Sequence, residues 1–396
     1  MVSMERIPPS SLSSETRKMG DFLKKTSEMQ ISDYKRRFSS VKGIYDRFLS
    51  KLILQGVDFR KAYDTSLKFF GSKKVKFAAI DGTEYYRRVF DLVIFFGGSY
   101  VCLGEVEFKQ ESEPKVNYYT KYIEEGRGIS SCVPMYIDNV PDVDQKFFSE
   151  EEPGEISVTI PLEGQEIIDN SEIAERIMHL SEYYLAFKLI TKFERDVKVL
   201  LMDRNLSGDQ AGLISRTSKK SLWRRRSSLI GLEIDGTRID ENHLEISRFR
   251  ILNWDLDTIP SRGDYLRYKL IFLLEKGDFS LEEVYDRLRI KNEKRRKRVE
   301  RTLKKLVEKE IIEGKGEKFS LNEKYRDTWE KIKKLTQKLS DRIFLSPKKG
   351  EITMNVFKVK KNGKEFWLTT LDLSFLTLFT LYMLIEECWK RTFVFF

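Results

Sequence analysis

The sequence FAAIDGT, residues 77–83, places an aspartate directly after a short apolar run. A second apolar run, VKVLLM at residues 197–202, is followed by Asp203. Short apolar runs are typical of strands buried in a sheet. Open α/β sheets carry their sites at the carboxyl ends of such strands. Asp81 and Asp203 therefore predict a site at one edge of an α/β sheet, although Asp-Gly after a strand is also common in turns.

The segment between the two aspartates predicts a hairpin and a helix. Residues 89–96 and 100–108 are rich in strand-forming residues, and Gly97-Gly98 between them predicts a two-residue turn. Residues 110–168 contain several prolines and predict an irregular segment with further strands and loops. Residues 170–195 predict a helix with one apolar stripe and with Ser171 as its N-cap.

Strand-end aspartates combined with a helix glutamate are suited to one kind of chemistry. Phosphodiester hydrolysis needs charge stabilised on the attacking and leaving oxygens, which two divalent cations ~4 Å apart can do. Mn²⁺ and Mg²⁺ are hard ions that prefer oxygen ligands. Gly82, which has no side chain, would let a substrate or metal approach the backbone beside Asp81.

FAAIDGTE, followed by a hairpin, a helix and VLLMDRNLSGD, resembles the NurA nuclease family. In that family one strand ends in a (V/I)DGS-type motif and a later strand in an LLDGSL-type motif. Thr83 replaces the first serine here, and Arg204-Asn205 stand where Gly-Ser is usual in the second motif. The resemblance covers roughly residues 15–217, with residues 350–396 as a second candidate stretch. It implies an RNase H-like mixed sheet flanked by helices.

The resemblance also implies a set of catalytic and metal-binding residues: Asp81, Glu182 and Asp203, with Mn²⁺ or Mg²⁺ as cofactor. Glu182 is the best match for the helix glutamate of the family, and Glu175, about two turns earlier, is its competitor. Glu105 and Glu107 alternate onto one face of a predicted strand, so one of them is an alternative ligand.

The partners that the resemblance implies are DNA, a second copy of the chain and a HerA-like hexameric ATPase, acting in DNA end processing and double-strand break repair. Members of the family continue beyond the strand that residues 392–396 (TFVFF) resemble, so the sequence predicts an incomplete C-terminus. A degenerate paralogue that has lost catalysis is therefore one alternative.

Residues 261–345 predict a winged-helix insertion. Helices are expected at 266–274, 280–288 and 293–309, followed by two strands within 311–320 around Gly314-Lys315-Gly316, and by a further helix at 325–345. The third helix is basic except for an apolar stripe, and in a winged helix this element faces DNA. A charged, solvated helix or a protein-binding wing is the alternative. The residues predicted to bind nucleic acid are Lys294, Arg295, Arg296, Arg298, Arg301 and Lys315, with Arg224, Arg225 and Arg226 from a second basic run.

The bulk composition agrees with a polyanion partner without requiring one. Lys and Arg number 72 against 62 Asp and Glu, which gives a net charge of +10. Such an excess favours nucleic acid, but a charge-rich thermophile surface has a similar composition. A non-catalytic winged-helix DNA-binding protein is thus the alternative from another functional class. Trp223, within the second basic run, can stack on a base or, as we expect, pack in the core.

The remaining segments complete the predicted organisation. A helical segment (1–70) precedes the first part of the nuclease core (71–217) and a β-rich connector (218–260), in which residues 228–255 alternate like strands. After the insertion, residues 346–396 return to the core. They are predicted to form a hairpin turning at Asn362-Gly363, an apolar helix at 373–390 and a strand at 392–396.

Two patterns bear on the cellular compartment. The three cysteines are widely spaced without a zinc pattern, which predicts reduced, buried thiols in a cytoplasmic protein. The N-terminus lacks the apolar core of a secretory signal. The apolar stretch 366–385 is interrupted by Asp372 and is shorter than the ~20 uninterrupted residues of a membrane span, so we expect a buried helix and no membrane association.

Overall fold

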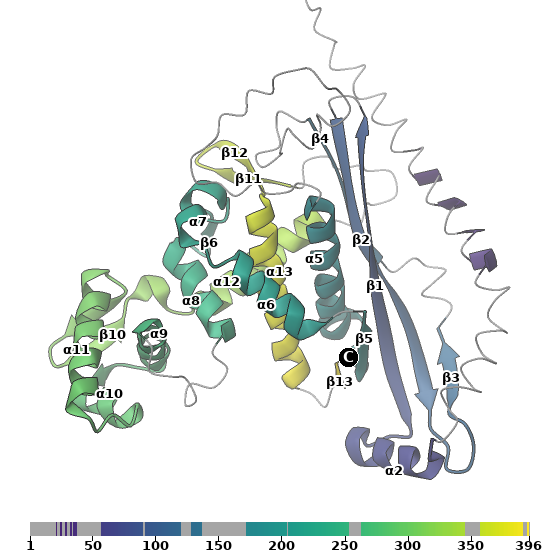
Figure 1. The fold of residues 1–396 in the computed structure, drawn as a ribbon, viewed down its shortest axis with the longest axis horizontal. Coiled ribbons are helices and arrows are strands. Elements are labelled where there is room, and N and C mark those ends of the chain that lie inside the picture. Colours follow the sequence, from purple (N-terminus) through teal and green to yellow (C-terminus); the bar gives the residue numbers. More distant parts are fainter. Residues whose placement is uncertain are drawn as a thin grey trace, which may run out of the picture. The chain divides into compact units, whose positions relative to one another are not determined.

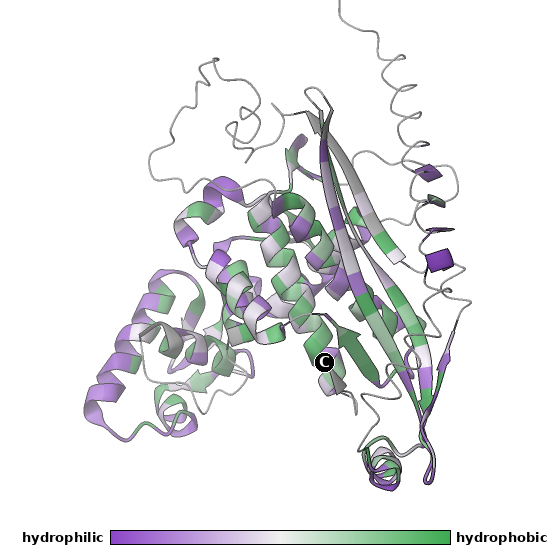
Figure 2. Ribbon diagram, turned by 45° about the vertical axis from the view of Figure 1, so that its right-hand side comes forward, coloured by the Kyte–Doolittle hydropathy of each residue, from purple (hydrophilic) through white to green (hydrophobic). Residues whose placement is uncertain are grey.

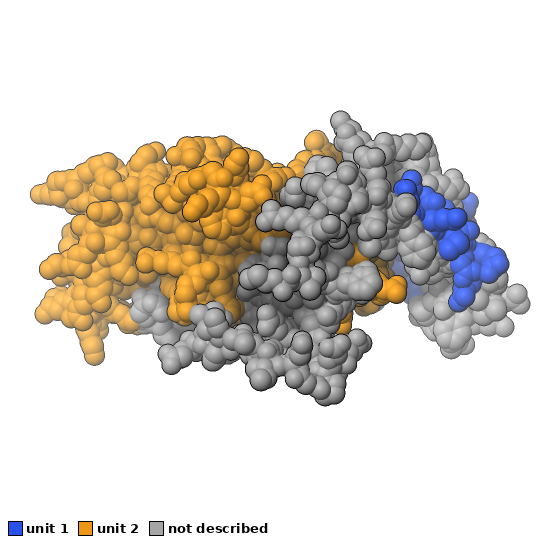
Figure 3. All heavy atoms as spheres, turned by 90° about the horizontal axis from the view of Figure 1, so that it is seen from above, with its two compact units in different colours: residues 1–75, 105–117, 347–353 blue, residues 76–104, 118–346, 354–396 orange. Residues whose placement is uncertain are grey.

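The computed structural model describes residues 57–89, 92–119, 128–136, 172–203, 205–252, 263–344, 357–390 and 394–395, with a few helical residues between 21 and 37. The chain divides into two compact units (Figure 3): residues 1–75, 105–117 and 347–353, and residues 76–104, 118–346 and 354–396. The smaller unit contains α2 (Phe59–Phe70), which begins after the capping residue Asp58 and ends at Gly71. Gly71 has a φ of 69°, a left-handed conformation that favours glycine at the end of a helix.

A mixed sheet forms the framework of the fold, as the sequence predicts (Figure 1). Its order is β13-β5-β1-β2-β3, and β4 also pairs with β2. β5 runs parallel to both β1 and β13, whereas β4 is antiparallel to β2. The strands are β1 (Lys74–Val89), β2 (Leu92–Glu107), β3 (Lys115–Tyr118), β4 (Gly128–Tyr136), β5 (Val199–Met202) and β13 (Val394–Phe395).

The predicted turn at Gly97-Gly98 is wrong, because both glycines lie inside the long strand β2. They pair with Ser131 and Ser130 of β4 in regular register. A side chain at Gly97 would come within 2.8 Å of Ile177, on the helix that packs against the sheet. Gly97 therefore permits close approach of a helix to the strand, which is the other common role of a glycine in a strand.

Helices cover one side of the sheet, and the most buried of them is α13 (Thr370–Trp389). It runs beside α5 (Glu172–Lys188) in Figure 1, and α5 continues as the π-helix η2 (Leu189–Phe193). α13 is apolar on all sides because α5, α6, α8 and α12 surround it. These neighbours are α6 (Leu206–Arg216), α8 (Glu241–Leu252) and α12 (Thr328–Ile343), and the short α7 (Lys220–Arg226) precedes α8.

Asp372, which interrupts the apolar stretch, belongs to the N-terminal cap of α13 rather than to an exposed face. It forms a capping box with Thr369 and is completely buried. Its carboxylate accepts hydrogen bonds from the Ser227 hydroxyl at 2.7 Å and the Ser228 backbone N–H at 2.9 Å. Burial raises the pKa of Asp372, and these donors oppose that shift. Among the described residues, no helix has the length and apolarity to cross a membrane.

The prediction of strands throughout residues 228–255 is wrong. Only β6 (Glu233–Ile234) and β7 (Thr237–Arg238) form there, and α8 follows. Asp240 starts this helix by accepting the backbone N–H groups of Asn242 and His243. The centre of α8 is buried on all sides, because Leu244 packs in the core of the sheet while Ile246 packs in a second core. A helix between two cores has no single apolar stripe, so the spacing of the apolar residues in α8 did not indicate a helix.

That second core belongs to the basic module, which we define as residues 263–325. Its three helices and hairpin follow the predicted order, and a short strand that the sequence did not predict, β8, lies between the first two helices. β8, β10 and β9 form its antiparallel sheet. The elements are α9 (Gly263–Leu274), β8 (Phe279–Ser280), α10 (Leu281–Arg287), α11 (Glu293–Glu308), β9 (Ile312–Lys315), β10 (Lys318–Leu321) and the 3-10 turn η3 (Glu323–Tyr325).

The C-terminal elements agree with the sequence prediction. β11 (Lys358–Lys361) and β12 (Lys364–Trp367) form a hairpin that turns at Asn362 and Gly363, both with positive φ. β13 lies parallel to β5 at the edge of the sheet. The predicted cap Ser171 and most of the predicted N-terminal helical segment fall outside the described residues.

Candidate active site and nucleic-acid interface

Asp81 and Asp203 lie side by side where β5 ends against β1. The parallel register of β1 and β5 runs from Phe77 opposite Val199 to Ile80 opposite Met202, and adjacent strands lie about 4.8 Å apart. Asp203 directly follows the last residue of β5, as predicted, but the predicted strand end at Asp81 is wrong, because β1 continues through Asp81 to Val89. Both aspartates are exposed, and Asp81 accepts the backbone N–H of Gly82 at 2.9 Å. Parallel pairing thus brings together two carboxylates that are more than a hundred residues apart in the sequence.

Glu182 of α5 lies against the residue that follows Asp81. A side chain added at Gly82 would overlap the Oε1 atom of Glu182, and it would come within 2.6 Å of the Cγ atom of Met178. Glu182 is 5% exposed, whereas Asp81 and Asp203 face solvent. Gly82 is therefore the position at which β1 and α5 approach most closely, and its missing side chain leaves the space that the Glu182 carboxylate occupies.

The donor set at this edge suits a hard divalent cation, because all of its side-chain donors are carboxylate oxygens. The side chains do not form a finished cluster. Among the described residues, no group of three or more His, Cys, Asp or Glu side chains is arranged to hold a metal ion. The backbones of Asp81 and Asp203 are adjacent, and the Glu182 carboxylate lies against Gly82. Gly82 faces α5, so the side chain of its strand neighbour Asp81 projects from the opposite face of β1, where it accepts the Gly82 N–H.

The competing glutamates have other partners. Glu175 of α5 is 3.4 Å from the Nε2 atom of His179 and 4.0 Å from the Nη1 atom of Arg176. Glu105 and Glu107 of β2 share one cation, because their carboxylates lie 3.6 and 3.9 Å from the Nζ atom of Lys74. That shared partner is expected for alternate residues on one face of a strand.

A hydrogen bond that sequence reasoning did not identify links α5 to α6. The buried hydroxyl of Tyr183, next to Glu182, donates to the Oδ2 atom of Asp209 at 2.6 Å. Asp209 lies in the first turn of α6, the helix that follows Asp203. The bond therefore fixes the start of α6 relative to α5. The only sequence signal for it is the acidic residue in LSGD, six positions after Asp203.

α11 carries more basic residues than any other described element. It contains eight basic and three acidic residues, and it begins after Asn292, which accepts the N–H of Lys294 at 2.8 Å. Val299, Leu303 and Leu306 are its buried residues, as the sequence predicts. The rest of the helix is polar, and it is the largely purple helix at the edge of Figure 2. Lys294, Arg295, Arg298 and Arg301 are all exposed on it.

Two of the predicted nucleic-acid contacts also have partners within the basic module. Arg296 is half-buried, lies 4.6 Å above the ring of Tyr285 and is 3.8 Å from the Oε2 atom of Glu282. It therefore helps to hold α10 against α11. Lys315 is exposed on β9, where its Nζ atom is 3.6 Å from Glu313. Phosphate contact by Lys315 would compete with a weak surface ion pair.

The second basic run forms α7. Arg225 is exposed and Arg226 is half-buried, while Arg224 pairs with Glu241 of α8. Trp223 is 1% exposed and packs edge-on against Phe375 of α13, with ring centroids 5.3 Å apart. Packing in the core, rather than stacking on a base, is therefore its role, as expected from the sequence.

Comparison with known proteins adds three structures. No family model matches the sequence, and no curated protein matches it. Similar solved structures include NurA with manganese (TM-score 0.23, 11% identity, 86% of this chain and 63% of that chain), NurA (0.25, 13%, 90% and 66%) and NurA bound to dAMP and manganese (0.20, 13%, 88% and 63%). This chain spans less than two thirds of the length of each of those chains.

Proposed function

We propose that the protein is a metal-dependent DNA nuclease whose site is the sheet edge formed by Asp81, Asp203 and Glu182. The observation that supports this most directly is the parallel register of β1 and β5, which puts Asp81 beside Asp203. The approach of Glu182 to Gly82 adds a third carboxylate from the helix. The sequence resemblance to the NurA family supports the same three residues.

In this proposal, the three carboxylates would hold Mn²⁺ or Mg²⁺. When bound, such an ion lowers the pKa of a bound water and neutralises charge on the phosphate oxygens. Asp203 follows the last residue of β5 and is not held by strand pairing, whereas Asp81 could share an ion with Glu182 only if β1 changed its local conformation at Asp81 and Gly82. Glu182 is buried against Gly82 and offers a carboxylate whose position is fixed by packing. The basic residues of α11 would hold the DNA backbone by non-specific, salt-sensitive contacts with phosphates.

The test is a nuclease assay with Mn²⁺ on linear single- and double-stranded DNA, comparing the wild-type protein with Asp81→Asn. The wild type should degrade DNA only with metal, and the variant should lose that activity. Calorimetric titration with Mn²⁺ alone gives a second readout, because Asp81→Asn should also weaken metal binding. Glu175→Gln is the matched control, since Glu175 pairs with His179 and should leave cleavage unchanged.

One observation favours a second candidate, a non-catalytic DNA-binding protein. The described residues contain no preformed three-ligand group, while the basic module has its own core and a strongly basic helix. Under this alternative, the wild type and Asp81→Asn would bind DNA equally and neither would cleave it. The same assay, run with a binding measurement in EDTA, therefore separates the two functions.

The partners form a further part of the proposal, which rests on the sequence resemblance alone. We propose a homodimer that works with a HerA-like hexameric ATPase in DNA end processing and repair. Co-purification with such an ATPase and sedimentation analysis of the isolated protein would test these two points separately.

A further inference from the structure

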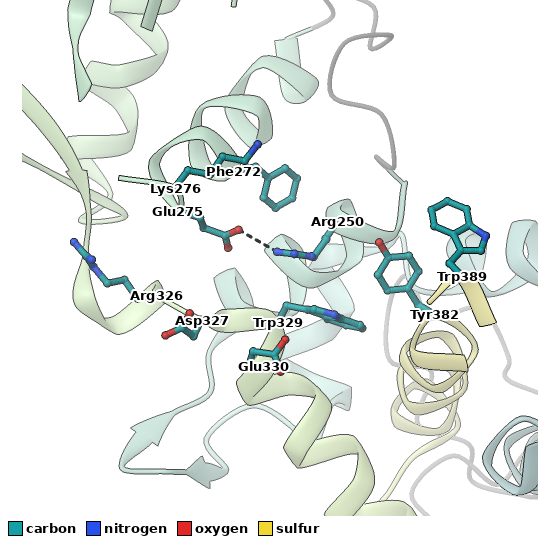
Figure 4. Close-up of a pocket in the computed structure, with 10 residues that line it drawn as sticks. All are labelled: Arg250, Phe272, Glu275, Lys276, Arg326, Asp327, Trp329, Glu330, Tyr382 and Trp389. Atoms are coloured by element: carbon teal, nitrogen blue, oxygen red, sulfur yellow. Dashed lines mark hydrogen bonds and ion pairs between the residues drawn. The ribbon is translucent and has the colours of Figure 1, made fainter. Parts of the chain in front are cut away.

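A cavity of about 490 Å³ lies where α8, α9, α12 and α13 meet, away from the carboxylate edge (Figure 4). This volume is within the range of small-molecule sites. The cavity adjoins the basic module, because α9 is the first helix of that module. The described residues that line it are Arg250, Phe272, Glu275, Lys276, Arg326, Asp327, Trp329, Glu330, Tyr382 and Trp389.

Aromatic side chains form one part of the lining. Trp329 and Tyr382 are buried and meet edge-on, with centroids 5.1 Å apart. The Trp329 indole donates to Glu386 at 2.9 Å, so its ring orientation is fixed. Trp389, near the end of α13, is 70% exposed and is the most exposed of the large apolar side chains described. An exposed tryptophan beside a cavity offers a stacking surface for a planar ring.

Polar groups lie opposite these rings. The Nη1 atom of Arg250 and the Oε2 atom of Glu275 are 3.0 Å apart, and Figure 4 shows the two side chains pointing toward each other between Phe272 and Trp329. Asp327 has a φ of 52°, and its side chain makes no capping hydrogen bond to α12. Burial, aided by the charge of Asp327, raises the pKa of Glu275. Two carboxylates and one guanidinium thus provide both acceptors and donors.

The charge of the lining limits which ligand fits. Arg250, Lys276 and Arg326 oppose Glu275, Asp327 and Glu330, so the positive and negative side chains are equal in number. A simple anion or cation would meet charges of its own sign. A neutral planar ring that carries both donors and acceptors meets complementary groups. Lys276 and Arg326 add positive charge close to such a ring, where a phosphate attached to it would be stabilised.

We propose that this cavity binds one unpaired nucleobase that carries an amino group, such as cytosine, from a DNA strand held by the basic module. Trp389 would stack on the base, and Glu275 or Asp327 would accept its amino hydrogens. This proposal rests on the proposed function only in taking DNA as the source of the base. Such a site would let the protein recognise single-stranded ends or gaps in DNA. The basic side chains of α11 alone would not distinguish these from duplex DNA.

The experiment measures binding in EDTA of a single-stranded dC oligonucleotide, a dT oligonucleotide and a blunt duplex. Trp389→Ala should weaken dC binding by about tenfold, the effect of losing one stacked base, and leave duplex binding unchanged. Glu275→Gln should reduce the preference for dC over dT. Phe69→Ala, at an exposed aromatic residue of α2, is the matched control and should change none of these affinities.

A parallel titration with dCMP separates this proposal from the DNA interface. The titration is followed by calorimetry, because Trp389→Ala would itself remove a fluorophore. Binding of dCMP that is present in the wild type and lost in Trp389→Ala supports the cavity, even if oligonucleotides do not bind. Oligonucleotide binding that is equal in the wild type, Trp389→Ala and Glu275→Gln overturns the cavity proposal and leaves the nuclease proposal standing. A wild type that binds neither dCMP nor oligonucleotides overturns both the base site and the DNA interface.

Discussion

The sheet edge and α11 both gather like charges, but they hold them in different ways. At the edge, Asp81 and Asp203 are placed by the register of two strands, and Glu182 by a close approach that only glycine permits. On α11, three buried apolar residues hold the helix, and its basic side chains point away from that stripe. Each carboxylate therefore depends on an individual position, whereas the positive charge is distributed over many equivalent ones.

This difference has a consequence for function. A site that depends on position should fail when one atom is changed, because cation binding needs a defined set of ligands. A distributed interface should lose DNA affinity in proportion to the charge removed, since each phosphate contact adds a similar amount to the free energy of binding. The two regions should therefore respond differently to conservative substitutions of single residues.

The largest effect is expected for Glu182→Gln. Replacing one carboxylate oxygen by an amide nitrogen should lower metal-dependent cleavage by about 100-fold or more, which corresponds to ~2.7 kcal/mol of transition-state stabilisation. The measurement is cleavage rate together with urea unfolding. Equal cleavage by the variant and the wild type would remove Glu182 from the site.

A second prediction concerns the space beside Asp81. Gly82→Ala should displace the Glu182 carboxylate and lower cleavage by roughly tenfold, while costing about 1–3 kcal/mol of stability because the added methyl group overpacks the space between β1 and α5. Thermal unfolding and cleavage rate measure the two effects. The control is Gly212→Ala in α6, which meets no atom within 4 Å and should stabilise the helix by about 0.5–1 kcal/mol.

The sequence predicted the elements whose patterns are local. The third helix of the basic module was predicted with its buried residues, because Val299, Leu303 and Leu306 recur at helical spacing. The hairpin at Asn362-Gly363 was predicted because Asn-Gly favours the positive φ values that a tight turn needs, and both residues adopt them. Asp81 and Asp203 also carried a local signal, namely an apolar run followed by Asp, but β1 continues past Asp81 to Val89 because it pairs with the long strand β2.

The errors arose where tertiary packing decides the structure. Gly97 and Gly98 were predicted as a turn, but a glycine in a strand can equally admit a helix, and only the position of Ile177 distinguishes the two roles. α8 was predicted as strands because it is buried between two cores and lacks one apolar face. The bond from Tyr183 to Asp209 was missed because its partners are 26 residues apart and neither follows a motif.

Substitutions on α11, the distributed interface, are expected to have an effect of intermediate size. Arg295→Gln combined with Arg301→Gln should lower duplex affinity about tenfold near physiological salt and reduce the salt dependence of log Kd by roughly two phosphate contacts. The measurement is DNA affinity over a range of salt concentrations. Arg296→Gln is the control, because Arg296 lies over Tyr285 and should lower stability more than it changes the salt slope. A loss of binding from Arg295→Gln alone would contradict a distributed interface.

The smallest effect is expected from removing one tyrosine–carboxylate hydrogen bond in each of the two regions. Tyr183→Phe removes a hydroxyl that donates to Asp209 at 2.6 Å, and Tyr285→Phe removes one that donates to Glu300 at 2.7 Å. Both should cost roughly 1–2 kcal/mol in unfolding, since each bond has an ionised acceptor. Only Tyr183→Phe should also slow cleavage, by a few-fold, because it loosens α6 beside Asp203. Equal cleavage by both variants would mean that the position of α6 does not matter to the carboxylate edge.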